Sequence, residues 1–79
     1  MVLGRTLVVV QTIEPGPYRH FKGGRYEVVE VARDSETELP VVVYRALRDG
    51  SLWVRSLAMF TETVLVDGVA RPRFERDAE

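Results

Sequence analysis

The only histidine in the chain, His20, is the one side chain whose ordinary pKa suits acid–base chemistry near neutral pH. A general base needs an orienting partner, and Glu36 and Glu62 are the candidates for that role. One histidine and no cysteine argue against a catalytic triad or a transition-metal site within one chain. We therefore expect no catalytic residues, no metal and no cofactor. A small enzyme or accessory subunit that uses His20 and Glu36 is the third hypothesis for function. Otherwise His20 is a half-exposed strand residue.

A second set of residues suits binding, and a predicted hairpin across the Asp-Gly pair at 49–50 brings it together. Asp-Gly indicates a two-residue turn, because both central positions need a positive φ. Such a turn places Ala46 opposite Trp53 and Tyr44 opposite Arg55, and alternation puts all four on one face. Arg55 stacked on Tyr44, with a tryptophan beside a small alanine, would form a shallow binding groove. In the alternative interpretation, Trp53 fills the open end of the domain as a core residue.

Three further residues are expected near this face. Arg19 and His20 are predicted neighbours of the groove. The loop Asp34–Thr37 carries Glu36, which would stand at the rim and recognise a cation or an amine. The alternative for this loop is a tight turn, because an Asp side chain can accept hydrogen bonds from the backbone two residues on.

The segment 16–25 carries three bases and no acid, with aromatic residues between them. Stacking rings beside cations that hold phosphates are typical of single-strand nucleic-acid binding. The alternative is an ordinary first strand followed by a glycine turn, with Tyr18 and His20 on one face and Arg19 and Phe21 on the other. Nucleic-acid binding through residues 18–25 is therefore the second hypothesis and is not favoured. The net charge of −1 also lacks the basic excess that duplex binding requires.

The composition of the chain indicates one small domain without disulfides, since it has 79 residues and no cysteine. No apolar run approaches the roughly 18 residues of a membrane span, so we expect no membrane partner. The run at residues 7–10 is too short for the core of a signal peptide, which makes a cytoplasmic location the default.

Short valine-rich runs between regular turn signals favour an all-β sandwich or small barrel. A single helical turn is expected at Leu57–Thr63, with Leu57 and Phe60 on one face. The predicted strands are Tyr18–Phe21, Arg25–Arg33, Val41–Leu47, Leu52–Ser56, Val64–Val66 and Val69–Arg71.

The two ends of the chain are expected to differ from the domain between them. Residues 14–74 form the predicted domain, and residues 75–79 form a polar, frayed tail. Residues 1–13 are an N-terminal extension in which Leu7–Ile13 is a predicted edge strand. That strand either closes the barrel or pairs with a second subunit, which predicts a homodimer through the N-terminal strand.

Several short motifs stand at a characteristic spacing along the chain, namely Tyr18–Gly23, Tyr26–Val28, Ala32-Arg33, Ser35–Thr37, Val42–Tyr44, Leu52–Arg55 and Met59-Phe60. Read in order, they resemble a bacterial family catalogued as domain of unknown function 1653. The resemblance covers about residues 16–74 and implies a small SH3-like β-barrel, without an activity. Asp34 stands where the family usually has His, and Ser56 where it usually has Pro.

Together these observations predict an SH3-like barrel of five or six strands with at most one short helical turn. Its first expected function is non-catalytic binding of an unidentified protein or small ligand. The expected binding residues are Tyr44, Trp53, Arg55, Arg19, His20 and Glu36.

Overall fold

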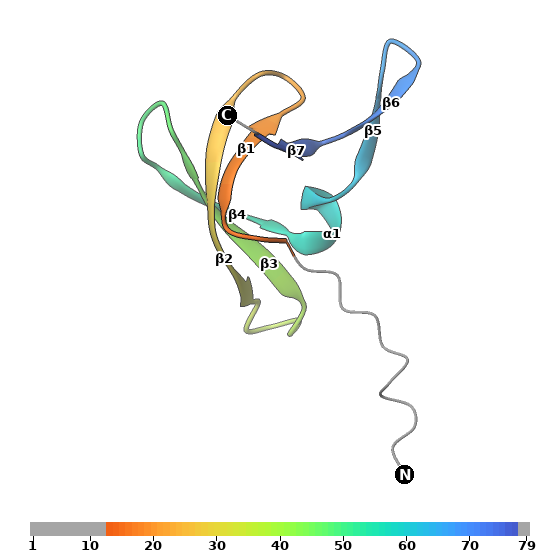
Figure 1. Cartoon of the computed structure of the whole chain (residues 1–79). Coiled ribbons are helices and arrows are strands. Elements are labelled where there is room, and N and C mark those ends of the chain that lie inside the picture. The colour runs from red at the N-terminus through yellow and green to blue at the C-terminus, as the bar shows by residue number, and fades with distance from the viewer. Residues whose placement is uncertain (1–12, 78–79) are drawn as a thin grey trace.

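The computed structural model describes residues 13–77, so the predicted strand Leu7–Ile13 and its dimer contact lie almost wholly outside the described residues. The described chain forms seven strands and one short helix (Figure 1). In chain order they are β1 (Gly16–His20), β2 (Arg25–Arg33), β3 (Pro40–Ala46), β4 (Leu52–Ser56), α1 (Leu57–Phe60), β5 (Thr63–Val66), β6 (Val69–Pro72) and β7 (Phe74–Arg76). The prediction of a small, mostly β domain is confirmed, whereas the SH3-like description stays a prediction. No helix in this part of the chain is long and apolar enough to cross a membrane.

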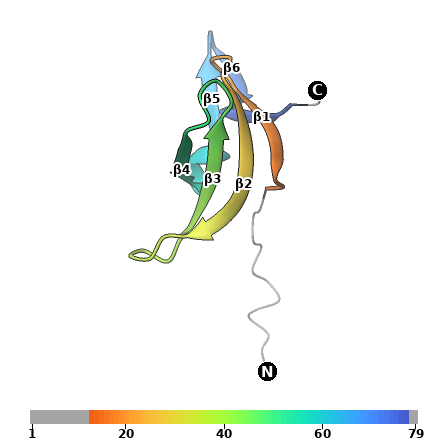
Figure 2. The same cartoon turned by 90° about the vertical axis from the view of Figure 1, so that its left-hand side faces the viewer.

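Five of the strands form one antiparallel sheet in the order β4-β3-β2-β1-β7, and β5 and β6 form a separate hairpin. The long strands are visibly curved, and the β5–β6 hairpin projects away from them (Figures 1 and 2). Among the described residues, the ladder of the large sheet ends at β4 and β7. Side chains nevertheless bridge these two edges, because the Arg55 guanidinium of β4 lies 5.7 Å from the ring centre of Phe74 in β7.

The β5–β6 hairpin has the turn that its sequence predicts. Asp67 and Gly68 both have positive φ, at 52° and 80°, as a two-residue turn between twisted strands requires. Val66 and Val69 are paired directly across it. The same prediction of a two-residue turn is wrong for the Asp-Gly pair at 49–50.

The β3–β4 loop spans residues 47–51, and Tyr44 lies opposite Trp53 instead of Arg55. The amide of Leu47 donates to the carbonyl of Arg25 in β2, which ends the β3–β4 pairing before the predicted turn. The side chain of Asp49 then accepts hydrogen bonds from both the amide and the hydroxyl of Ser51. Because the register differs by an even number of residues, each side chain keeps its predicted face.

The core lies on the concave side of the large sheet, under α1. At its centre the rings of Phe60 and Phe74 are stacked, with centroids 3.9 Å apart and planes inclined by 5°. Ser56 caps the first turn of α1 by accepting a hydrogen bond from the amide of Met59, and the predicted pair Leu57 and Phe60 is buried. The buried cluster consists of Tyr18, Val28, Val42, Tyr44, Leu57, Phe60 and Phe74.

The expectation of a frayed tail does not hold for residues 75 and 76, which belong to β7. This strand pairs with β1, so that His20 lies opposite Phe74 and Tyr18 opposite Arg76. The Arg76 guanidinium lies 5.3 Å from the ring centre of Tyr18 and donates to the carbonyls of Glu14 and Pro15. The C-terminal segment is therefore held by the contact of Arg76 with the buried Tyr18 ring. Hydrogen bonds from Arg76 to the two residues that precede β1 also hold it.

Candidate functional site

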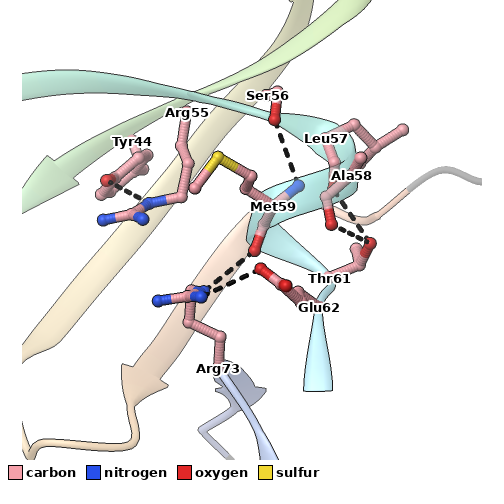
Figure 3. Close-up of polar contacts among 9 residues, drawn as sticks. All are labelled: Tyr44, Arg55, Ser56, Leu57, Ala58, Met59, Thr61, Glu62 and Arg73. Atoms are coloured by element: carbon pink, nitrogen blue, oxygen red, sulfur yellow. Dashed lines mark hydrogen bonds and ion pairs between the residues drawn. The ribbon is translucent and has the colours of Figure 1, made fainter. Parts of the chain in front are cut away.

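Two aromatic residues, Tyr44 and Phe74, contact the side chain of Arg55 on the edge strand β4. Its Nε donates to the hydroxyl of Tyr44 at 3.3 Å, and its guanidinium faces the Phe74 ring at 5.7 Å (Figure 3). Within residues 13–77, no carboxylate forms an ion pair with it. Arg55 is therefore an oriented guanidinium, partly covered by a ring, whose terminal nitrogens have no acidic partner in the described chain.

His20 stands at the end of β1, packed edge-on against Phe74 with ring centres 4.8 Å apart. Its Nδ1 accepts a hydrogen bond from the amide of Lys22 at 3.1 Å, so the neutral ring carries its proton on Nε2. Partial burial lowers the pKa of His20 below its usual 6.5, and the positive charges of Arg55, Arg73 and Lys22 lower it further. The pKa of His20 therefore depends on the local excess of positive charge.

Arg73, between β6 and β7, joins the C-terminal segment to the helix α1. Its Nε donates to the carbonyl of Met59 at 3.1 Å, and its Nη2 contacts Glu62 at 2.9 Å. Figure 3 shows the Arg55 and Arg73 side chains pointing to the same side of α1. Because Glu62 neutralises Arg73, Arg55 is the better placed of the two to receive an external anion.

The predicted contact between Tyr44 and Arg55 is present, although its geometry differs from the expected stacking. Tyr44 is buried, and only its hydroxyl meets Arg55, through a hydrogen bond across neighbouring strands. The ring that faces the guanidinium is Phe74. Trp53 shares the face but is 50% exposed, with its indole N–H bonded to Ser51 Oγ at 2.8 Å. The interpretation of Trp53 as a core residue is therefore wrong.

Two of the predicted neighbours do not join the site. Arg19 lies on the opposite face of β1 from His20, and its guanidinium is 3.6 Å from the carboxylate of Asp77. Glu36 lies in the turn between β2 and β3, where the Asp34 side chain accepts hydrogen bonds from the amides of Glu36 and Thr37. The predicted tight turn is thus present. It follows the end of β2 at Arg33, whereas His20 lies beside the start of β2, next to the Arg19–Arg25 pair. The structure does not bring His20 and Glu36 together.

The basic segment at residues 16–25 is partly neutralised by the carboxylate of Asp77. Arg25 lies 3.5 Å from Asp77, so this one carboxylate serves both Arg19 and Arg25. The Lys22 Nζ lies over the Phe21 ring, at 5.8 Å from its centre. Elsewhere in residues 13–77, the structure brings no three His, Asp or Glu side chains together in a way that could hold a metal ion.

Sequence reasoning missed Phe74 and Arg73. Phe74 is the ring that orients Arg55 and packs against His20, and Arg73 is one of the cations around that histidine. A usable signal was present, since Phe74 is the one large apolar residue in an otherwise polar C-terminal segment. Its partners lie in β1, β2, β3, β4 and α1, so nothing local to the segment indicated that it forms a strand.

Comparisons with known proteins agree with the resemblance noted in the sequence. The sequence profile described as "Protein of unknown function (DUF1653)" matches residues 16–76. A crystal structure of a protein belonging to DUF1653 from Bordetella bronchiseptica is 36% identical, with a TM-score of 0.78. The match covers 87% of this chain and 92% of that chain. The comparison with curated proteins finds no match.

Proposed function

This chain belongs to the DUF1653 family of proteins of unknown function, and from its own geometry we propose that it is a non-catalytic binding module that recognises an oxyanion group at Arg55. The observation that carries the proposal is an oriented guanidinium without an acidic partner in the described chain. A planar guanidinium matches the geometry of a carboxylate or a phosphate and binds either with two parallel hydrogen bonds.

The groups around Arg55 support an anionic ligand. The Tyr44 hydroxyl accepts from Arg55, so its own proton remains available for donation. His20 presents an N–H at Nε2, because its Nδ1 is already an acceptor. These donors and the neighbouring cations all favour negative charge. A cation as ligand is less favoured among the described residues, because Glu36 lies in the β2–β3 turn and the Glu62 carboxylate is paired with Arg73.

The half-exposed indole of Trp53 suggests an apolar group attached to the anion. Trp53 and Arg55 are two residues apart on one face of β4, which corresponds to about 7 Å along a strand. An aromatic or aliphatic group beside the bound oxyanion could therefore contact the indole. The ligand class that fits both residues is a small molecule or peptide side chain that joins an oxyanion to an apolar group.

The other two hypotheses receive less support from the described residues. An enzyme that uses His20 and Glu36 would need them within hydrogen-bond reach of one substrate, and they lie on different parts of the sheet. Nucleic-acid binding through residues 18–25 would need free cations along the segment, and Asp77 contacts both Arg19 and Arg25. The Arg55 site requires neither arrangement.

A titration of the ¹⁵N-labelled protein with three small probes tests the proposal. Phenylacetate and phenyl phosphate are expected to shift the Arg55 Nε–H and Trp53 indole N–H signals, since each probe joins an oxyanion to a ring. Phenylacetamide, the neutral isostere of phenylacetate, is the matched control and is expected to shift the Arg55 signal little. A response to phenyl phosphate alone would identify phosphate as the group recognised. An Arg55 signal that no anionic probe moves would refute the proposal.

A further inference from the structure

Strand β4 presents an open edge that is unusually apolar. No strand of the described chain pairs with its outer side, because β4 ends the order of the five-stranded sheet. Leu52, Trp53 and Val54 are 56%, 50% and 65% exposed. Natural edge strands usually carry Lys, Pro or a bulge that discourages pairing with another chain, and between Leu52 and Val54 the edge has none of these.

The hydrogen bonds of the β3–β4 ladder fix which backbone groups are open. The amide of Ala46 donates to the carbonyl of Ser51 at 2.9 Å, so Ser51 faces β3. Antiparallel pairing alternates, and Trp53 and Arg55 therefore also turn their backbone groups towards β3. Leu52 and Val54 turn their N–H and C=O groups outward.

We propose that the open edge of β4 pairs with β4 of a second copy of this chain, antiparallel and centred on Val54. The two Val54 residues would then exchange N–H···O=C bonds across the two-fold axis, as their outward groups allow. Trp53 would lie opposite Arg55 of the second copy, on the same face, twice in each dimer. The inference rests on the backbone of the edge and on this pairing, and it does not depend on the proposed recognition of an oxyanion.

Charge complementarity selects this register from the symmetric alternatives. A pairing centred on Arg55 would oppose two guanidinium groups, which is destabilising. A pairing centred on Trp53 would oppose the two indoles and leave both arginines opposite Ser51. The pairing centred on Val54 gives each guanidinium an exposed indole, which is a favourable cation–π partner. Because β4 is short, the interface would fall below the roughly 1,200 Å² of stable complexes, and a concentration-dependent equilibrium is expected.

Sedimentation velocity over a wide range of concentrations tests this dimer, with Val54→Lys as the disrupting variant. Two lysines at the two-fold axis should weaken association about tenfold or more. Val69→Lys in β6 is the matched control, since Val69 is also exposed, at 60%, and lies on the separate hairpin. A wild-type chain that stays monomeric at every concentration would overturn the proposal. Equal weakening by both variants would also overturn it.

Two further variants test the register and the competing dimer. Trp53→Arg should weaken association by opposing two arginines, and adding Arg55→Trp should restore it, because residues 53 and 55 of the two copies face each other. A double variant that folds, as judged by circular dichroism, but does not recover association would exclude the register centred on Val54. Val9→Lys probes the N-terminal segment. If that variant dissociates the dimer and Val54→Lys does not, the contact lies in the N-terminal segment and the proposal is wrong.

Discussion

Replacing Phe60 with Ala is expected to leave the protein with little residual stability at room temperature. Phe60 is 1% exposed, stacked on Phe74, and in edge-to-face contact with Tyr18 and Tyr44. Loss of a buried phenylalanine costs about 3–5 kcal/mol through lost burial and the cavity that remains. A domain of this size has a free energy of unfolding on the order of 5 kcal/mol, so one such change consumes most of it.

Urea unfolding followed by circular dichroism measures this effect, with Trp53→Ala as the matched aromatic control. Trp53 has the larger ring, but it is half exposed on an edge strand and should cost about 1 kcal/mol or less. The midpoint of the Phe60 variant should therefore collapse while that of the Trp53 variant changes little. Similar losses from the two variants would contradict the description of Phe60 as the centre of the core.

Arg55→Gln is expected to weaken binding of phenylacetate or phenyl phosphate at least tenfold. A hydrogen bond to a charged group contributes about 1.5–3 kcal/mol, and each 1.4 kcal/mol corresponds to a factor of ten in affinity. Glutamine keeps much of the stem but removes the charge and the planar fork. Arg55→Lys should give an intermediate affinity, because it keeps the charge without the two parallel hydrogen bonds.

Arg71→Gln is the control for this experiment. Arg71 is exposed on β6 and is one of the arginines outside the site, so the variant makes the same change in net charge. Isothermal titration calorimetry on the three variants and the wild type measures the affinities. If Arg71→Gln weakens binding as much as Arg55→Gln, the effect comes from net charge, and Arg55 does not form the site.

Turn chemistry that depends on adjacent residues was predictable, and contacts with distant segments were not. The bounds of Arg25–Arg33 and Leu52–Ser56 follow from their turn signals and alternation, and the structure has both strands at the predicted bounds. The β3–β4 register was not predictable, because the bond from the Leu47 amide to Arg25 joins residues from two different hairpins. Strand β7 was missed for a similar reason, since its partner β1 is more than 50 residues earlier in the chain.

The face of the candidate site was predictable although the register was not. Tyr44 and Arg55 share a face in either register, because the error is even and the period of a strand is two. The same period explains why Arg19 is absent from the site, since His20 next to it already points to the concave side. The burial of Tyr44 and the exposure of Trp53 depend on the position of each strand in the sheet. Alternation along one strand carries no information about that position.

The pKa of His20, measured with and without an anionic probe, tests the recognition of an oxyanion most directly. His20 is the only histidine, so its Hε1 signal reports one titration without assignment. In the free protein its pKa should lie below 6.5, because burial and the charges of Arg55, Arg73 and Lys22 disfavour the imidazolium.

An anion bound at Arg55 would offset those positive charges and stabilise the imidazolium, so saturation with phenylacetate should raise the pKa of His20. By linkage, the affinity for the anion should then increase as the pH falls through that pKa. Phenylacetamide should leave the pKa unchanged, and Arg55→Gln should raise it without any probe. A pKa of His20 that is the same with and without saturating phenylacetate and phenyl phosphate would contradict an oxyanion site at Arg55.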